Sequence, residues 1–130
     1  MNIGVVARKS GLPPKTIRYY EDIGLILPDR LDNGYRSYTD ADTEKLRFLQ
    51  RARSLGFSIE DCRRLLSLYD DKHRASADVK AVAQKHLEII EEKIRELESL
   101  KRTLRVLIDE CRGDHRPDCP IINDLAGRNS

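Results

Sequence analysis

Aromatic residues are scarce in this chain of 130 residues: they make up 5% of it, and tryptophan is absent. Cysteine is also rare, with 3 copies, and no apolar run is long enough to span a bilayer. The first residues lack the basic-then-apolar pattern of a secretory signal. Charged residues, in contrast, make up 35% of the chain. We therefore expect a soluble, helix-rich cytoplasmic protein with no membrane partner, in which the thiols stay reduced and a standing disulfide is disfavoured.

The chain also has little net charge. A formal value of +2 argues against binding to polyanions through bulk charge. Lys and Arg modestly outnumber Asp and Glu in residues 1–66 but not in residues 67–130, so a nucleic-acid signal must come from the placement of cations in the first half. A Gly-rich phosphate loop, His-Glu-x-x-His and Gly-x-Ser-x-Gly are all missing from the sequence, and we expect no enzyme activity.

Two short helices are expected at the start of the chain. Asn2 is a candidate N-cap for the first helix, and Gly11 a candidate end. The Pro-Pro pair at 13–14 suits the first turn of a second helix, which continues through residues 15–21 and stops at Gly24. Two short helices joined by a Gly-containing turn form the helix-turn-helix pattern, whose second helix enters the major groove of DNA. The pattern is common, so it indicates DNA binding without establishing it.

A β-hairpin is expected directly after these helices. Apolar residues 25–27 predict one strand, residues 35–38 predict the return strand, and Asn33-Gly34 predicts a two-residue turn because both residues accept positive φ. A hairpin beside a recognition helix is called a wing. Arg36 suits phosphate contact, whereas Tyr38 fits a core position as well as it fits DNA contact. The candidate DNA-binding residues are Lys15, Thr16, Arg18, Tyr19, Tyr35, Arg36 and Arg53.

Two further helices begin at signals that resemble capping boxes. Thr39-x-x-Asp42 and Ser58-x-x-Asp61 each place an Asp three residues after a hydroxyl-bearing N-cap. The first of these helices is expected to end near Leu55, and the second carries an apolar stripe that includes Cys62. Because a free cysteine packs as a small apolar residue, we assign Cys62 to the core and give it no ligand role.

A polar hinge at residues 70–75 precedes one long expected helix that begins near Ser76. About 35 residues of helix span roughly 50 Å, and the chain has no second long helix to cover its apolar seam. The simplest partner is a second copy, and a symmetric dimer suits a palindromic DNA site. The seam consists of Val79, Ala83, His86, Ile90, Ile94, Leu97, Leu100, Leu104, Leu107 and Cys111.

Several motifs occur in a defined order along nearly the whole chain. They are Met1-Asn2-Ile3-Gly4, Ser10-Gly11-Leu12, Thr16-Ile17-Arg18-Tyr19-Tyr20-Glu21, Gly24-Leu25-Ile26, Asn33-Gly34-Tyr35-Arg36-x-Tyr38 and Arg53-x-Leu55-Gly56-Phe57-Ser58. In this combination the sequence resembles the MerR family of transcription activators. Val5 stands where many relatives carry an acidic residue, and we expect this difference to affect the surface rather than the fold.

The resemblance implies a mainly α fold with three parts. Residues 1–69 are expected to form a winged helix-turn-helix DNA-binding domain with hinge helices, and residues 70–110 the hinge and an antiparallel coiled-coil dimerisation helix. Residues 111–130 are expected to form a metal-binding loop and the C-terminal tail.

The C-terminal segment is similar to the copper-sensing branch of that family, through Cys111-x-Gly113-Asp114-x-x-x-Asp118-Cys119-Pro120-Ile121-Ile122. Two thiolates are too few for a closed tetrahedral zinc site, whereas they suit a soft monovalent ion. We expect Cys111 and Cys119 to bind one Cu(I), or alternatively Ag(I) or Au(I). His115 lies in a charged loop and is expected to be exposed, and the apolar residues Ile121, Ile122 and Leu125 are expected to close over the loop.

Ser76 bears on the choice of ion. In the antiparallel dimer that the resemblance implies, Ser76 of one protomer faces the 111–119 loop of its partner. Relatives that sense divalent ions place a cysteine here, so Ser76 favours a monovalent ion, and it also fits a plain N-cap.

The expected function is that of a homodimeric, Cu(I)-responsive regulator on a palindromic operator. By resemblance, it activates copper-tolerance genes with RNA polymerase through metal-dependent distortion of promoter DNA. Two alternatives stay open: a site for another ion, such as silver, gold or zinc, or a redox pair formed by Cys111 and Cys119.

Overall fold

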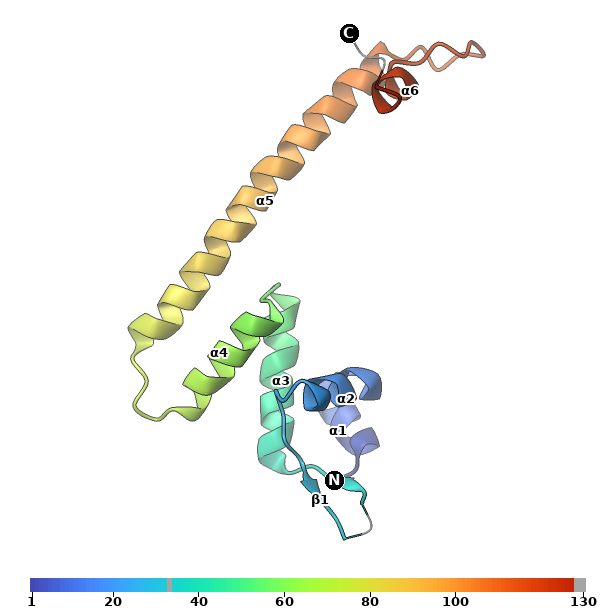
Figure 1. The fold of residues 1–130 in the computed structure, drawn as a ribbon. Helices are drawn as coiled ribbons and strands as arrows, with labels where there is room; N and C mark the ends of the chain where they lie inside the picture. Colours follow the sequence, from blue (N-terminus) through green and yellow to red (C-terminus); the bar gives the residue numbers. More distant parts are fainter. Residues whose placement is uncertain (33, 128–130) are drawn as a thin grey trace. The chain divides into compact units, whose positions relative to one another are not determined.

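The computed structural model describes residues 1–32 and 34–127 of the chain (Figure 1). It divides into two compact units, residues 1–83 and residues 84–130. Within the described residues, no helix is both long and apolar enough to cross a membrane.

The first two helices are α1 (Ile3–Ser10) and α2 (Pro14–Asp22). The Asn2 side chain accepts a hydrogen bond from the Val5 N–H, and Gly11 ends α1 with a φ of 76°, a left-handed conformation that glycine adopts without a Cβ penalty. Pro13 and Pro14 occupy the start of α2, where a missing N–H costs little. The predicted helix-turn-helix is therefore confirmed, together with its start and stop signals.

The wing consists of β1 (Asp29–Arg30) and β2 (Arg36–Ser37), which pair antiparallel with Arg30 opposite Arg36. The Leu31 N–H donates to the Tyr35 carbonyl, so the connection is longer than the predicted two-residue turn. Gly34 has the expected positive φ, of 85°, and its N–H donates to the Leu31 carbonyl. Asn33, the other residue of the predicted turn, lies outside the described residues.

The prediction of a strand at residues 25–27 is wrong. Leu25 and Ile26 are buried, and the N–H groups of both donate to the Tyr20 carbonyl at the end of α2 instead of joining the sheet. Leu27 is 80% exposed, and β1 begins only after Pro28. Packing into the core explains the apolar residues Leu25 and Ile26, and it does not require strand pairing.

The next two helices are α3 (Asp40–Ser54) and α4 (Ile59–Asp70). Thr39 and Asp42 form both halves of a capping box, and Ser58 accepts from the Asp61 N–H, so both predicted starts are confirmed. Their inward faces meet α1, α2 and the wing in one core, in which Cys62 is fully buried as predicted. The largest fully buried side chains are Tyr38, Ile17, Leu46, Leu49, Val6 and Cys62.

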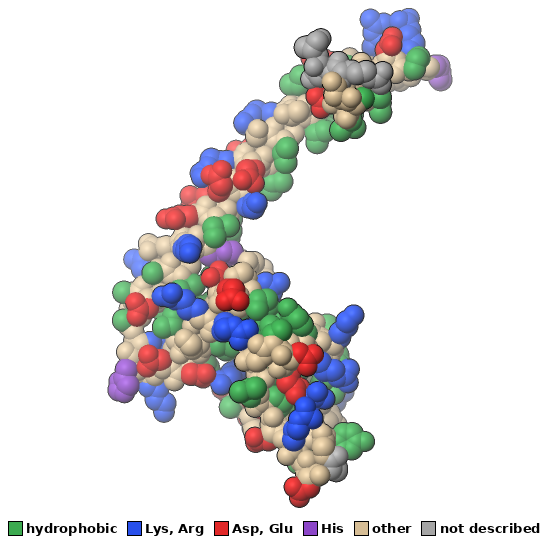
Figure 2. Space-filling view, in the orientation of Figure 1, with side chains coloured by type: hydrophobic (Ala, Val, Ile, Leu, Met, Phe, Trp, Pro, Cys, Tyr) green, Lys and Arg blue, Asp and Glu red, His purple; other side chains and the backbone are tan. Residues whose placement is uncertain are grey.

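The long helix α5 (Ser76–Glu110) has 35 residues and begins at the predicted position. Its first turns belong to the first unit, where Val82 is buried and Val79 packs against the core. Along the rest of α5, apolar side chains recur on the surface (Figure 2), and Leu97 is 62% exposed in the single chain. A loop and the short helix α6 (Pro120–Leu125) follow.

Candidate DNA interface and two-thiol loop

Helix α2 has a buried face and an exposed face. Ile17 and Tyr20 are buried in the core, and this packing sets the rotation of the helix about its axis. Lys15, Arg18 and Tyr19 are exposed, and Thr16 is half-buried. The exposed face therefore carries the predicted DNA-binding side chains of this helix.

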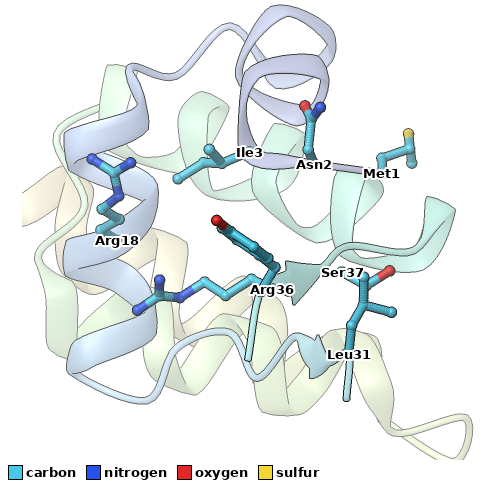
Figure 3. Close-up of a pocket in the computed structure, with 8 residues that line it drawn as sticks. Met1, Asn2, Ile3, Arg18, Leu31, Arg36 and Ser37 are labelled. Atoms are coloured by element: carbon cyan, nitrogen blue, oxygen red, sulfur yellow. The ribbon is translucent and has the colours of Figure 1, made fainter. Parts of the chain in front are cut away.

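A surface groove runs between the start of α1, the exposed face of α2 and the wing (Figure 3). Arg18 comes from α2, and Arg36 comes from β2 with its guanidinium extending toward that helix. Tyr35, which is 72% exposed, also borders the groove. Recognition helix and wing thus bring Arg18 to one groove with Tyr35 and Arg36, which lie well beyond it in the sequence. The full lining is Met1, Asn2, Ile3, Arg18, Leu31, Tyr35, Arg36 and Ser37.

Glu21 is the counterion of Arg36, and sequence reasoning did not single it out. The Arg36 Nε contacts Glu21 Oε2, and Glu21 raises the pKa of Arg36, first as the acceptor beside Nε and second through its charge. The Nε–H makes no hydrogen bond of standard geometry, so the contact between the two side chains is an ion pair. Only the tertiary fold brings these two residues together.

Arg53 makes contacts within the protein. Its Nη1 donates to the Phe57 carbonyl at 2.6 Å and closes the turn between α3 and α4. Its charge also acts on the buried Tyr20, whose pKa is raised by burial and lowered in part by Arg53. Arg53 is exposed, and DNA contact by this residue stays a prediction.

The two C-terminal cysteines meet across the loop after α5. The Cys111 N–H continues the helical hydrogen bonding of α5 by donating to Leu107 and Ile108 carbonyls, and Cys119 is the N-cap residue of α6. Gly113, with a φ of 64°, helps the chain reverse between them. The two Sγ atoms are 3.4 Å apart, and both cysteines are half-buried. The structure therefore brings together the two predicted metal ligands.

The surroundings of Cys119 favour the thiolate. The backbone N–H of Ile122 lowers the pKa of Cys119 most, followed by the Cys111 thiol, and partial burial acts in the opposite direction. The sulfur makes no capping hydrogen bond of standard geometry, and the nearby N–H dipoles of α6 act on it through their partial positive charge.

The donor set fits a soft ion with few ligands. Among the described residues, no group of three or more His, Cys, Asp or Glu side chains is placed to hold a metal ion. His115 is exposed, as expected, and leaves Cys111 and Cys119 as a pair. Two thiolates suit Cu(I) and similar soft ions better than Zn²⁺, which takes four ligands in structural sites.

Two further expectations concern the surroundings of this loop. In the single chain, Ile122 is 55% exposed and Leu125 is 77% exposed, so the predicted apolar closure over the loop is not formed. Ser76 is exposed on the first turn of α5, and its approach to a partner's loop stays a prediction.

An exposed cationic helix beside a wing defines the chain as a helix-turn-helix DNA-binding regulator. Residues 1–69 match the model of the MerR HTH family regulatory proteins, and residues 43–107 match the model described as MerR, DNA binding. The chain belongs to the MerR family of transcription regulators, which are not enzymes. The family and fold predicted from the sequence are confirmed.

Individual relatives cover nearly the whole chain. The HTH-type transcriptional regulator HmrR of Rhizobium leguminosarum bv. viciae is 62% identical over 97% of this chain and 98% of its own length. The heavy metal-dependent transcription regulator 2 of Rhizobium meliloti is 52% identical over 97% of this chain and 86% of its own length. The crystal structure of PbrR691 from Ralstonia metallidurans CH34 with lead(II) has a TM-score of 0.85 and 30% identity, covering 96% of this chain and 98% of that one.

Proposed function

We propose that this chain is a metal-responsive transcriptional regulator that senses Cu(I) through Cys111 and Cys119. The observation that carries the proposal is the pair of half-buried thiols, 3.4 Å apart at the two ends of one loop. Two similar proteins support a metal as the signal: one is described as heavy metal-dependent, and another was solved with lead(II).

The chemistry of the loop favours a monovalent ion. Two thiolates and one Cu(I) leave a net negative charge, and the backbone N–H groups near the Cys119 sulfur are suitable neighbours for that charge. When bound, the ion ties the end of α5 to the start of α6, and so favours one arrangement of the C-terminal segment. Ag(I) and Au(I) fit the same donors, whereas zinc needs further ligands, of which His115 is a candidate.

The proposed target is a palindromic promoter operator bound by a homodimer. Lys15, Thr16, Arg18 and Tyr19 of α2, Tyr35 and Arg36 of the wing, and Arg53 supply the contacts. The exposed apolar stripe of α5 supports antiparallel pairing with a second copy. On this proposal residues 1–69 bind DNA, residues 70–110 couple and dimerise, and residues 111–130 bind the ion. The dimer distorts the promoter for RNA polymerase and activates copper-tolerance genes.

Competition against chelators under reducing conditions tests the metal site. We expect the parent protein to bind one Cu(I) per chain, and Cys111→Ser and Cys119→Ser each to lose this binding and the metal-dependent transcription while keeping operator binding. The reason is that a hydroxyl stays protonated and is a hard, poor ligand for Cu(I). Cys62→Ser is the matched control, since its thiol is buried in the core of the first unit. Unchanged Cu(I) affinity in Cys119→Ser would show that the loop is not the site.

The redox alternative makes a different prediction for the same two thiols. Titration of free thiols with and without Cu(I) separates the two functions. Protection of Cys111 and Cys119 by Cu(I) supports metal sensing, whereas loss of both thiols on exposure to a mild oxidant, with no protection by Cu(I), supports the redox pair.

A further inference from the structure

The carboxylate of Glu21, at the end of α2, faces three donors of the wing. Arg30 Nη2 lies 3.5 Å from Oε1, while Arg36 Nε contacts Oε2 and the Tyr38 hydroxyl donates to the same oxygen at 3.5 Å. The Glu21 side chain is only 11% exposed, so these groups replace most of its water. One residue of the recognition helix thus binds both strands of the hairpin.

The register of the wing creates the need for this carboxylate. Arg30 and Arg36 are paired directly across the two strands, and like charges in opposed positions destabilise a hairpin. Glu21 offers one oxygen to each arginine and offsets this repulsion. The hairpin has two residues in each strand, and its return segment is also tied to the chain start by two backbone hydrogen bonds between Met1 and Tyr38, so the Glu21 contacts are what join it to α2.

The same contacts determine where Arg36 lies. Tyr38 is 1% exposed and anchors the return strand in the core, with its hydroxyl on Glu21. Burial raises the pKa of Tyr38, and the charge of Arg18, one helical turn before Glu21, acts in the opposite direction. Arg18 and Arg36 border one groove, and the Glu21 carboxylate joins the wing to α2 beside it (Figure 3).

We propose that Glu21 is a positioning residue for DNA recognition, which locks the wing onto the recognition helix and so holds Arg36 beside Arg18. This inference rests on the proposed DNA interface. The direction of the change in DNA affinity distinguishes positioning from charge, because an anion near a DNA-binding surface opposes binding through its charge alone. If Glu21 acts by positioning, its neutralisation weakens specific binding; if it acts only by charge, neutralisation strengthens binding.

Binding of Glu21→Gln protein to operator DNA and to unrelated duplex DNA at matched salt tests the proposal. We expect operator affinity to fall about tenfold, as a misplaced wing loses charge-assisted contacts. Affinity for unrelated DNA should stay equal or rise slightly, because that binding depends on net charge. The ratio of operator affinity to unrelated-DNA affinity should therefore fall. The slope of operator affinity against salt concentration should decrease by the equivalent of about one phosphate contact.

Asp22→Asn is the matched control, since Asp22 is an exposed neighbour on the same helix and loses the same charge. It should leave the affinity ratio unchanged. Glu21→Asp keeps the charge but is one methylene shorter and cannot reach both arginines, so it should lower operator affinity several-fold. If the Glu21→Gln variant fails to fold, the Glu21→Asp variant tests the proposal in its place.

Three results would overturn the proposal. The first is a Glu21→Gln protein that binds both DNAs as Asp22→Asn does, and the second is one that loses both affinities equally together with thermal stability. The third is a Glu21→Asp protein with parental operator affinity. The Arg18→Ala variant distinguishes failure of the Glu21 proposal from failure of the proposed DNA interface. If Arg18→Ala binds the operator as the parent does, the proposed interface itself is contradicted.

Discussion

Cys62 and Cys119 carry the same thiol in opposite surroundings. Cys62 is fully buried between helices of the first unit, and burial raises its pKa, against the opposing charge of Arg53. Cys119 is half-buried at the start of α6, where backbone N–H groups lower its pKa. Since the thiolate is the reactive and metal-binding form, residue environment separates a packing cysteine from a candidate ligand.

This contrast predicts the order of alkylation. At neutral pH and without metal, iodoacetamide should label Cys119 well before Cys62, and labelling of Cys119 should slow as the pH falls below its lowered pKa. Peptide mass spectrometry over a time course measures both rates. Faster labelling of Cys62 in the folded protein would contradict the assignment, and labelling in denaturant is the control for intrinsic reactivity.

Cys62→Ser should cost stability without affecting the metal response. The substitution places a hydroxyl in a site with no exposure, and an unsatisfied buried hydroxyl costs about 1–3 kcal/mol of unfolding free energy. Urea unfolding measures the loss, and Cu(I) competition should match that of the parent. A variant as stable as the parent would show that the site supplies a hydrogen-bond partner.

Arg18→Ala should weaken operator binding while the dimer stays intact. Arg18 is exposed on α2 and borders the groove shared with the wing. A lost base or phosphate contact costs on the order of 1–3 kcal/mol, so the dissociation constant should rise by about 5- to 150-fold. Electrophoretic mobility shift at fixed salt, with sedimentation as the check on assembly, measures both quantities.

At the scale of elements, α5 has more apolar surface than its own unit covers. Ile94, Leu97, Leu100 and Leu104 are each about half-exposed or more, at 48%, 62%, 60% and 54%. Buried apolar area is the main source of stability in helix pairing, and a stripe at this spacing is typical of a coiled-coil seam. We therefore expect a partner helix of matching pattern, and a second copy of the chain is the proposed partner.

Leu97→Glu should dissociate this pairing. A charge buried in the seam without a partner costs several kcal/mol, so the dimer dissociation constant should rise at least about 100-fold. Sedimentation of the metal-free protein measures it. Val106→Glu is the matched control, because Val106 is also exposed and lies on the opposite face of α5 at about 100° per residue. A parent protein that is monomeric at micromolar concentration would contradict the proposed dimer.

At the scale of the whole molecule, the proposed selectivity requires two copies. Both thiols come from one loop, after α5, whereas Ser76 belongs to the first unit of the chain. An antiparallel pair of α5 helices would bring Ser76 of one protomer to the loop of the other. The ion preference is therefore proposed as a property of the dimer.

Ser76→Cys should shift this preference toward divalent ions. A third thiolate from the partner chain gives a donor set closer to that of Zn²⁺, so the ratio of Zn(II) to Cu(I) affinity should rise about tenfold or more. Competition with chelators for both ions measures the ratio. Ala77→Cys is the control, since it adds a thiol one residue further along the helix. Equal ratios in the two variants would contradict the placement of Ser76 at the site.

Local signals in the sequence determined much of this protein. The caps at Asn2, Thr39 and Ser58 act over three residues, and the starts of their helices were predicted because such hydrogen bonds need no distant partner. The order and spacing of the family motifs determined the fold class. The resemblance of the C-terminal segment likewise predicted a loop with Cys111 and Cys119 together, and the two thiols meet because both lie within one short reversal of the chain.

Only the tertiary structure decided the position of the wing. Residues 25–27 have the composition of a strand, yet the N–H groups of Leu25 and Ile26 donate to the end of α2 and their side chains pack in the core, so pairing begins at Asp29. The anchor of that pairing is Glu21, whose partners Arg30 and Arg36 lie further along the chain. Contacts between distant residues depend on how the helices pack, because a carboxylate and a guanidinium attract whichever partner the fold brings near. Local sequence patterns therefore do not determine which residues become ion-pair partners.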